Sequence, residues 1–102
     1  MINKVDVLVR LFETIEKRSK EHPSTSYTAK LLSEGKDKCI EKLKEESLET
    51  AEAAEQDNTE QIIYESADLI YHLLVLWKKF DLSADQIYAE LESREGKTGL
   101  RK

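Results

Sequence analysis

One segment of the chain is apolar on almost every side, yet it carries a narrow line of ionisable groups. Residues 62–77 read IIYESADLIYHLLVLW. At about 100° per residue of an α-helix, five polar residues in and beside this segment share a strip about 60° wide. They are Gln61, Glu65, Asp68, His72 and Lys79. A helix that is hydrophobic on most sides has to be covered on most sides. We therefore expect this helix to lie inside a helical assembly, with a line of carboxylates at a packed surface.

The rest of the chain is also typical of helices. Charged residues make up 36% of the sequence, against 3 Gly and 1 Pro, a composition rich in helix formers and poor in breakers. Apolar residues recur at helical spacing in five segments, and no segment is typical of a strand. The predicted helices span residues 2–20, 27–33, 37–55, 59–80 and 83–94. The sequence therefore predicts an all-α fold, an antiparallel helical bundle.

Local signals support two of the helix starts and one buried face. Asn58 and Ser83 are each followed by Gln three positions later, at Gln61 and Gln86, which is the pattern of a capping box. On the helix 37–55, four small or apolar residues define the expected inner side. They are Ile40, Leu43, Ala51 and Ala54.

The length of 102 residues fits one domain. We assign residues 1–95 to this domain and residues 96–102 to a polar, mobile tail. A chain of this size buries only a modest core, and it has few other helices with which to cover residues 62–77. We therefore expect a second copy to complete the bundle, as a homodimer or a higher homo-oligomer.

The charge balance limits the classes of molecule that this chain is expected to bind. The formal net charge is −5, with 21 acidic and 16 basic residues and no block of Lys and Arg, so neither nucleic acid nor an anionic membrane is expected as a partner. A net acidic enzyme acting on a polyanion would need a metal ion.

Cys39 is the only cysteine of the chain, which excludes an internal disulfide. Without a signal-peptide pattern or a membrane-spanning apolar run, we expect a cytoplasmic protein.

Two pairs of carboxylates have the spacing of a metal site. Glu46 and Glu49 lie three residues apart on one helix, and Glu65 and Asp68 do so on the next. The short connection favours antiparallel neighbours, so the two pairs face each other. Ligands that are all oxygens suit Mg²⁺, with Mn²⁺ as a substitute, rather than zinc. The alternative for the first pair is a solvated helix face, with Lys42 pairing with Glu46.

The spelling of these motifs resembles a known family. EExxE at residues 45–49 and ExxD at residues 65–68 resemble the metal motif of the all-α, MazG-type nucleotide pyrophosphohydrolases. Residues 26–35, which begin SYTAKLL and end in Gly, and residues 67–75, ADLIYHLLV, narrow the resemblance to the phosphoribosyl-ATP pyrophosphohydrolase family. It extends from about Leu8 to Arg94. Lys44 departs from the family pattern, which often has Gly there.

The resemblance implies an activity and a division of roles. The reaction is hydrolysis of the α–β phosphoanhydride of phosphoribosyl-ATP to phosphoribosyl-AMP and pyrophosphate, in histidine biosynthesis. The two carboxylate pairs would hold Mg²⁺, which bridges phosphate oxygens and orients water. Glu45, or a carboxylate held only loosely to the metal, would accept the proton of that water.

Further residues are candidates for contact with the substrate. They are Tyr27, Thr28, Lys30, Lys36, Lys42, His72 and Arg94. Each of the basic residues also fits an ordinary surface charge, and Tyr27 also fits core packing. For His72 we favour a hydrogen bond to a carboxylate over direct metal ligation.

Two other functions fit the same sequence. One is a house-cleaning nucleoside triphosphate pyrophosphatase of the same superfamily, acting on dCTP or dUTP. The other is a non-catalytic helical dimerisation module whose acidic strip pairs with basic residues of a partner. Release of pyrophosphate that depends on magnesium would exclude the second.

Overall fold

The computed structural model describes residues 6–97 of the chain, and this part is entirely helical. The helices are α1 (Val7–Arg18), α2 (Tyr27–Ser33), α3 (Lys36–Glu55), α4 (Thr59–Lys79) and α5 (Ala84–Ser93). The all-α prediction is therefore confirmed, and the bounds of α2, α3 and α4 agree with the sequence to within a residue or so. Residues 2–5 of the first predicted helix and residues 98–102 of the predicted tail lie outside the described residues. The assignment of residues 1–95 to one domain stays a prediction.

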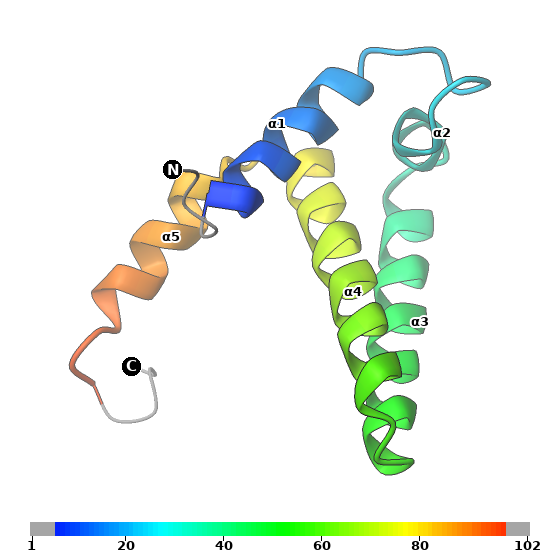
Figure 1. The fold of residues 1–102 in the computed structure, drawn as a ribbon. Coiled ribbons are helices and arrows are strands. Elements are labelled where there is room, and N and C mark those ends of the chain that lie inside the picture. The colour runs from blue at the N-terminus through cyan, green and yellow to red at the C-terminus, as the bar shows by residue number, and fades with distance from the viewer. Residues whose placement is uncertain (1–5, 98–102) are drawn as a thin grey trace.

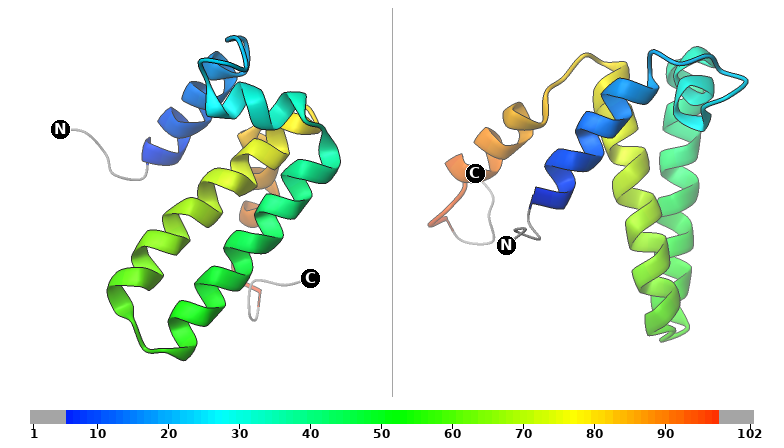
Figure 2. Two further views of the ribbon diagram at one scale, coloured as in Figure 1. Left: turned by 90° about the vertical axis from the view of Figure 1, so that its right-hand side faces the viewer. Right: turned by 45° about the horizontal axis from the view of Figure 1, so that its top comes forward.

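The two long helices set the architecture. α3 and α4 run antiparallel, side by side, as a hairpin (Figure 1). α1 crosses the C-terminal part of α4, and α2 lies at the N-terminal end of α3 (Figures 1 and 2). α5 lies on the far side of α1 from α3 (Figure 2). The other end of the hairpin, where α3 turns into α4, projects beyond these shorter helices.

The predicted caps form where the sequence places them. Asn58 Oδ1 accepts a hydrogen bond from the backbone N–H of Gln61 at 3.1 Å, and the N–H of Ser83 donates to Oε1 of Gln86 at 2.9 Å. These bonds satisfy backbone donors that have no partner inside the helix. Asp57, directly before Asn58, has a φ of 52°, a left-handed conformation that Asp tolerates better than most residues. The helix starts are thus fixed by local chemistry.

The apolar core sits at the covered end of the hairpin. Its largest fully buried side chains are Ile15 of α1, Leu31 of α2 and Val75 of α4. Lys79, in the last turn of α4, donates from Nζ to the carbonyl oxygen of Leu32 at 3.2 Å, which caps the end of α2. The core therefore ties α1 and α2 to the C-terminal half of α4.

The inner face of α3 was predicted only in part. Ile40 and Leu43 are half-buried, but Ala51 and Ala54 are exposed. The buried residues of this helix are Cys39, Glu46 and Ala53. They recur every seven residues and so share one face. The small apolar side chains were a poor guide, because a carboxylate that belongs to a cluster can occupy the packed side of a helix. α3 is rotated from the orientation that its apolar residues predicted, and Glu46 faces α4, as the two carboxylate pairs predicted.

The N-terminal half of α4 lacks the cover that its composition demands. Ile63 is 73% exposed and Ile70 39% exposed, and Ala67 between them is exposed too. The radius of gyration is 15.2 Å, compared with about 13 Å for a compact domain of this length.

Between residues 6 and 97, none of the helices has the length and apolar character needed to cross a membrane.

Candidate metal centre

Three carboxylates meet between the two long helices. Glu46 and Glu49 come from α3 and Glu65 comes from α4, and each offers an oxygen within 4.8 Å of the others. The antiparallel hairpin makes this possible, because residues before the connecting turn face residues after it. Asp68, one turn beyond Glu65, is half-buried. It lies outside this group of three, although its charge is close enough to act on Glu46.

The buried oxygens of this cluster fit the ligands of a cation. Glu46 and Glu65 are only 8% and 6% exposed. Oε2 of each has no hydrogen-bond partner among the residues that the structure describes. Oε1 of Glu65 accepts a bond from Nε2 of Gln61 at 2.7 Å, which orients that carboxylate. Buried carboxylates persist when they are paired, hydrogen-bonded or bound to a metal, and a set made only of oxygens suits Mg²⁺ or Mn²⁺.

The electrostatics of the cluster also indicate a site for a cation. Burial raises the pKa of Glu46 to about 7, and the charges of Glu49, Asp68 and Glu65 add to the effect. The pKa of Glu49 is also raised, first by the neighbouring carboxyl of Glu65. Neighbouring carboxylates disfavour each other's ionised form. A bound divalent cation would remove this repulsion and take the place of the proton on Glu46.

Glu45 differs from its neighbours in the cluster. Its Oε2 accepts a hydrogen bond from Nζ of Lys42 at 2.9 Å, and this bond lowers the pKa of Glu45. The side chain keeps 44% of its surface exposed. Glu45 is therefore ionised, accessible to water and held by a lysine one turn earlier on α3.

With this geometry, the comparison with known proteins decides the family. Residues 8–95 match the sequence model of phosphoribosyl-ATP pyrophosphohydrolase. The chain belongs to this family. The match covers almost the same stretch as the resemblance seen in the motifs, from about Leu8 to Arg94.

Several relatives carry the corresponding name. The phosphoribosyl-ATP pyrophosphatase of Nitrosomonas eutropha is 45% identical over 100 residues, which are 98% of this chain and 86% of the relative. That of Parvibaculum lavamentivorans is 47% identical over 93 residues, 91% of this chain and 85% of the relative. That of Geobacter metallireducens is 40% identical over 100 residues, 98% of this chain and 92% of the relative. The similarity thus extends along nearly the whole chain.

In this member of the phosphoribosyl-ATP pyrophosphohydrolase family, His72 lies beside the carboxylate cluster. The ring is buried, and its Nε2 lies 3.9 Å from Oε1 of Glu46, which exceeds the length of a hydrogen bond. Burial lowers the pKa of His72, and the charge of Lys42 acts in the same direction. A neutral imidazole therefore separates the carboxylates from the aromatic side chains of Tyr27 and Tyr71.

The remaining predicted substrate contacts fall in different places. Thr28 is buried and its hydroxyl is hydrogen-bonded to that of Tyr71. Lys30 on α2 and Lys36 in the first turn of α3 are exposed. Arg94 ends α5 and pairs with Glu90 at 2.9 Å. Because α5 lies on the far side of α1 (Figure 2), the fold does not bring Arg94 to the cluster.

A polar hollow next to the cluster was not predicted. It has a volume of about 250 Å³ and extends from the cluster to Gln56, the C-cap of α3. It is lined by Glu49, Glu52, Ala53, Gln56, Gln61 and Glu65. Glu52 continues the three-residue spacing of Glu46 and Glu49, so the sequence did contain a signal for it. The hollow gives the cluster an open side.

Proposed function

We propose that this chain hydrolyses the α–β phosphoanhydride of phosphoribosyl-ATP to phosphoribosyl-AMP and pyrophosphate, the second step of histidine biosynthesis, in the cytoplasm. The observation that carries the proposal is the buried carboxylate cluster, with two oxygens that lack partners in the described chain, in a member of this family. The names of the relatives support the same substrate.

We infer that the cofactor is Mg²⁺, with Mn²⁺ as a substitute. Glu46, Glu49, Glu65 and Asp68 would hold it. When bound, the cation offsets phosphate charge and orients a water molecule. Gln61 keeps Glu65 in position through its hydrogen bond. The unpartnered oxygens and the raised pKa of Glu46 support these four residues as ligands. Both observations indicate carboxylates that repel one another when no cation lies between them.

In this proposal Glu45 accepts the proton of the attacking water. Its carboxylate is exposed, ionised and fixed by Lys42, and a general base has to reach the water without being a tight metal ligand. The lowered pKa makes Glu45 a weaker base, but it also keeps the carboxylate deprotonated at neutral pH.

The enzymatic test uses release of pyrophosphate by the purified chain. We expect hydrolysis of phosphoribosyl-ATP that requires Mg²⁺ and stops with chelator, and little hydrolysis of dCTP or dUTP. Glu65→Gln should abolish turnover. Glu60→Gln is the matched control, because Glu60 is an exposed carboxylate in the first turn of the same helix. Preferential hydrolysis of dCTP or dUTP would instead assign the chain to house-cleaning, and no hydrolysis at all would favour a dimerisation module.

We propose further that two copies, or more, pack through the uncovered half of α4. Ile63, Ala67 and Ile70 form an exposed apolar ridge at positions i, i+4 and i+7, the spacing of a helix–helix contact. Two hairpins meeting there would make a four-helix bundle. Light scattering should detect a dimer or larger assembly, and Ile70→Glu should shift it toward monomer. A wild-type chain that is a stable monomer at micromolar concentration would refute this assembly.

A further inference from the structure

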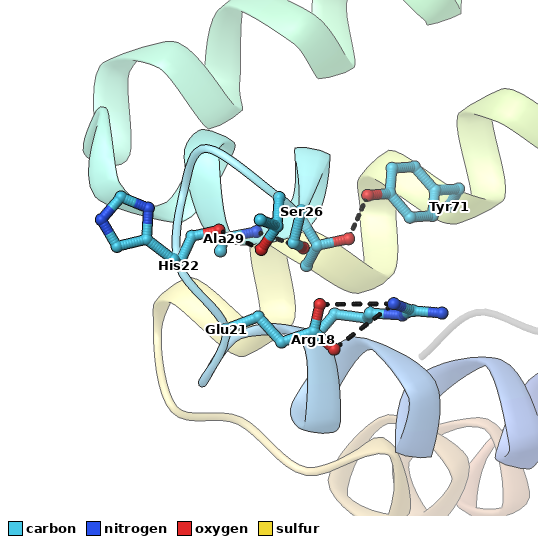
Figure 3. A network of polar contacts seen from close by, with 8 residues as sticks. Arg18, Glu21, His22, Ser26, Ala29 and Tyr71 are labelled. Carbon is cyan, nitrogen blue, oxygen red and sulfur yellow. Dashed lines mark hydrogen bonds and ion pairs between the residues drawn. The ribbon is translucent and has the colours of Figure 1, made fainter.

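Tyr27 is an aromatic side chain that the fold holds at the surface beside the carboxylate cluster. It is 53% exposed, although Ser26 before it and Thr28 after it are buried. Ser26 caps α2, because its hydroxyl accepts a hydrogen bond from the N–H of Ala29 at 3.1 Å (Figure 3). The backbone around Tyr27 is thus fixed by a capped helix start, and its ring projects from an ordered segment.

Two aromatic residues of α4 fix the orientation of the ring. The centroids of Tyr27 and Tyr71 are 6.4 Å apart, with planes inclined by 22°. His72 meets the same ring edge-on, at 6.2 Å and 86°. The hydroxyl of Tyr71 points toward α2 (Figure 3), where it is hydrogen-bonded to Thr28. Tyr27 therefore has its neighbours on one side and about half of its surface open.

This ring borders the groups assigned to the reaction. His72, which touches it, lies 3.9 Å from Glu46. Lys42 donates a hydrogen bond to Glu45, and this bond is the main cause of the raised pKa of Lys42. Tyr27 makes a smaller contribution in the same direction. A flat aromatic ring, an ammonium group and a carboxylate cluster thus lie next to one another.

We propose that the open face of Tyr27 is the platform on which the heteroaromatic base of the substrate stacks, with the phosphate chain passing Lys42 toward the carboxylates. This proposal rests on the proposed function, because it takes a nucleotide as the ligand. A nucleotide has the matching sequence of parts, a flat base at one end and a polyanionic chain at the other. Stacking on an aromatic side chain tolerates any base, since every base has a π-face. Tyr27 would therefore contribute affinity for the base rather than a choice between bases.

The test compares two probes that differ only in the base. AMP and ribose 5-phosphate are titrated calorimetrically into the full chain with Mg²⁺. We expect the wild type to bind AMP roughly 5- to 150-fold more tightly than ribose 5-phosphate, the range of one base stack. Tyr27→Leu should remove this difference, and Tyr27→Phe should keep it. Phe80→Leu is the matched control, because Phe80 is an aromatic residue of similar exposure, 51%, and it lies at the C-cap of α4, eight positions after His72.

Three results would overturn the platform. One is equal affinity of the wild type for the two probes, a result that needs no variant to fold. Another is a Tyr27→Leu chain with native helical circular dichroism that still prefers AMP. The third is a loss of affinity for both probes to the same degree in that variant, which would mean that Tyr27 acts on the phosphate site. None of these measurements depends on turnover, so failure to hydrolyse phosphoribosyl-ATP would refute the proposed function separately.

Discussion

Replacing Glu46 by Gln should stabilise the metal-free chain at neutral and alkaline pH. The carboxylate of Glu46 is 8% exposed and surrounded by other carboxylates. These surroundings raise its pKa from 4.5 to about 7. Gln has a similar shape and no charge. The substitution therefore removes both the cost of burying an ionised group and its repulsion with Glu49 and Glu65.

The sign and size of the effect follow from proton linkage. Between pH 4.5 and about 7 the folded chain keeps the proton of Glu46 after the unfolded chain has lost it. The free energy of unfolding therefore falls as the pH rises through this window. The full decrease in the free energy of unfolding is about 3 kcal/mol. This decrease is absent well below pH 4.5 and complete above pH 7. His72 acts in the opposite sense, because its pKa is lowered by burial, so the wild type has to be compared with the variant at each pH.

Urea denaturation from pH 4 to pH 8 in the presence of chelator measures this difference. We expect Glu46→Gln to match the wild type at the acid end and to be more stable by about 3 kcal/mol at the alkaline end. Added Mg²⁺ should stabilise the wild type, since a ligand of the folded state raises its free energy of unfolding, and should stabilise the variant far less. Parallel curves for the two proteins across the whole range, or equal stabilisation by Mg²⁺, would refute the reasoning.

Three further outcomes test other parts of the structure. Glu45→Gln should lower kcat roughly 10²–10⁴-fold without changing the Mg²⁺ affinity, whereas Glu49→Gln should weaken Mg²⁺ binding and be rescued by excess metal; the opposite pattern of rescue would reverse these roles. Ser26→Ala should lower the free energy of unfolding by about 1 kcal/mol in urea melts, and no change would contradict the cap on α2. Thr28→Val and Tyr71→Phe should each cost about 1 kcal/mol, and the double variant should cost much less than their sum, because both remove the same hydrogen bond; additive losses would argue against that bond.

The sequence alone determined the helices and the carboxylate pairs. Asn58 and Ser83 start their helices through bonds made within one turn, which is why such starts can be read without knowing the fold. The spacing of Glu46 and Glu49, opposite Glu65 across a short turn, was enough to expect a shared site. In each case the deciding interaction is local, or it follows from two helices joined by a short connection.

Only the tertiary structure decided which faces meet and what surrounds the site. The inner face of α3 carries Cys39, Glu46 and Ala53, whereas periodicity favoured the face of Ala51 and Ala54. The stacking of Tyr27 on Tyr71 joins residues 44 positions apart, and no local pattern encodes such a contact. Arg94, which the sequence placed with the substrate contacts, ends a helix that packs on the other side of α1 (Figure 2). Helical periodicity describes each helix by itself, whereas the choice of face depends on the chemistry of the helix it packs against.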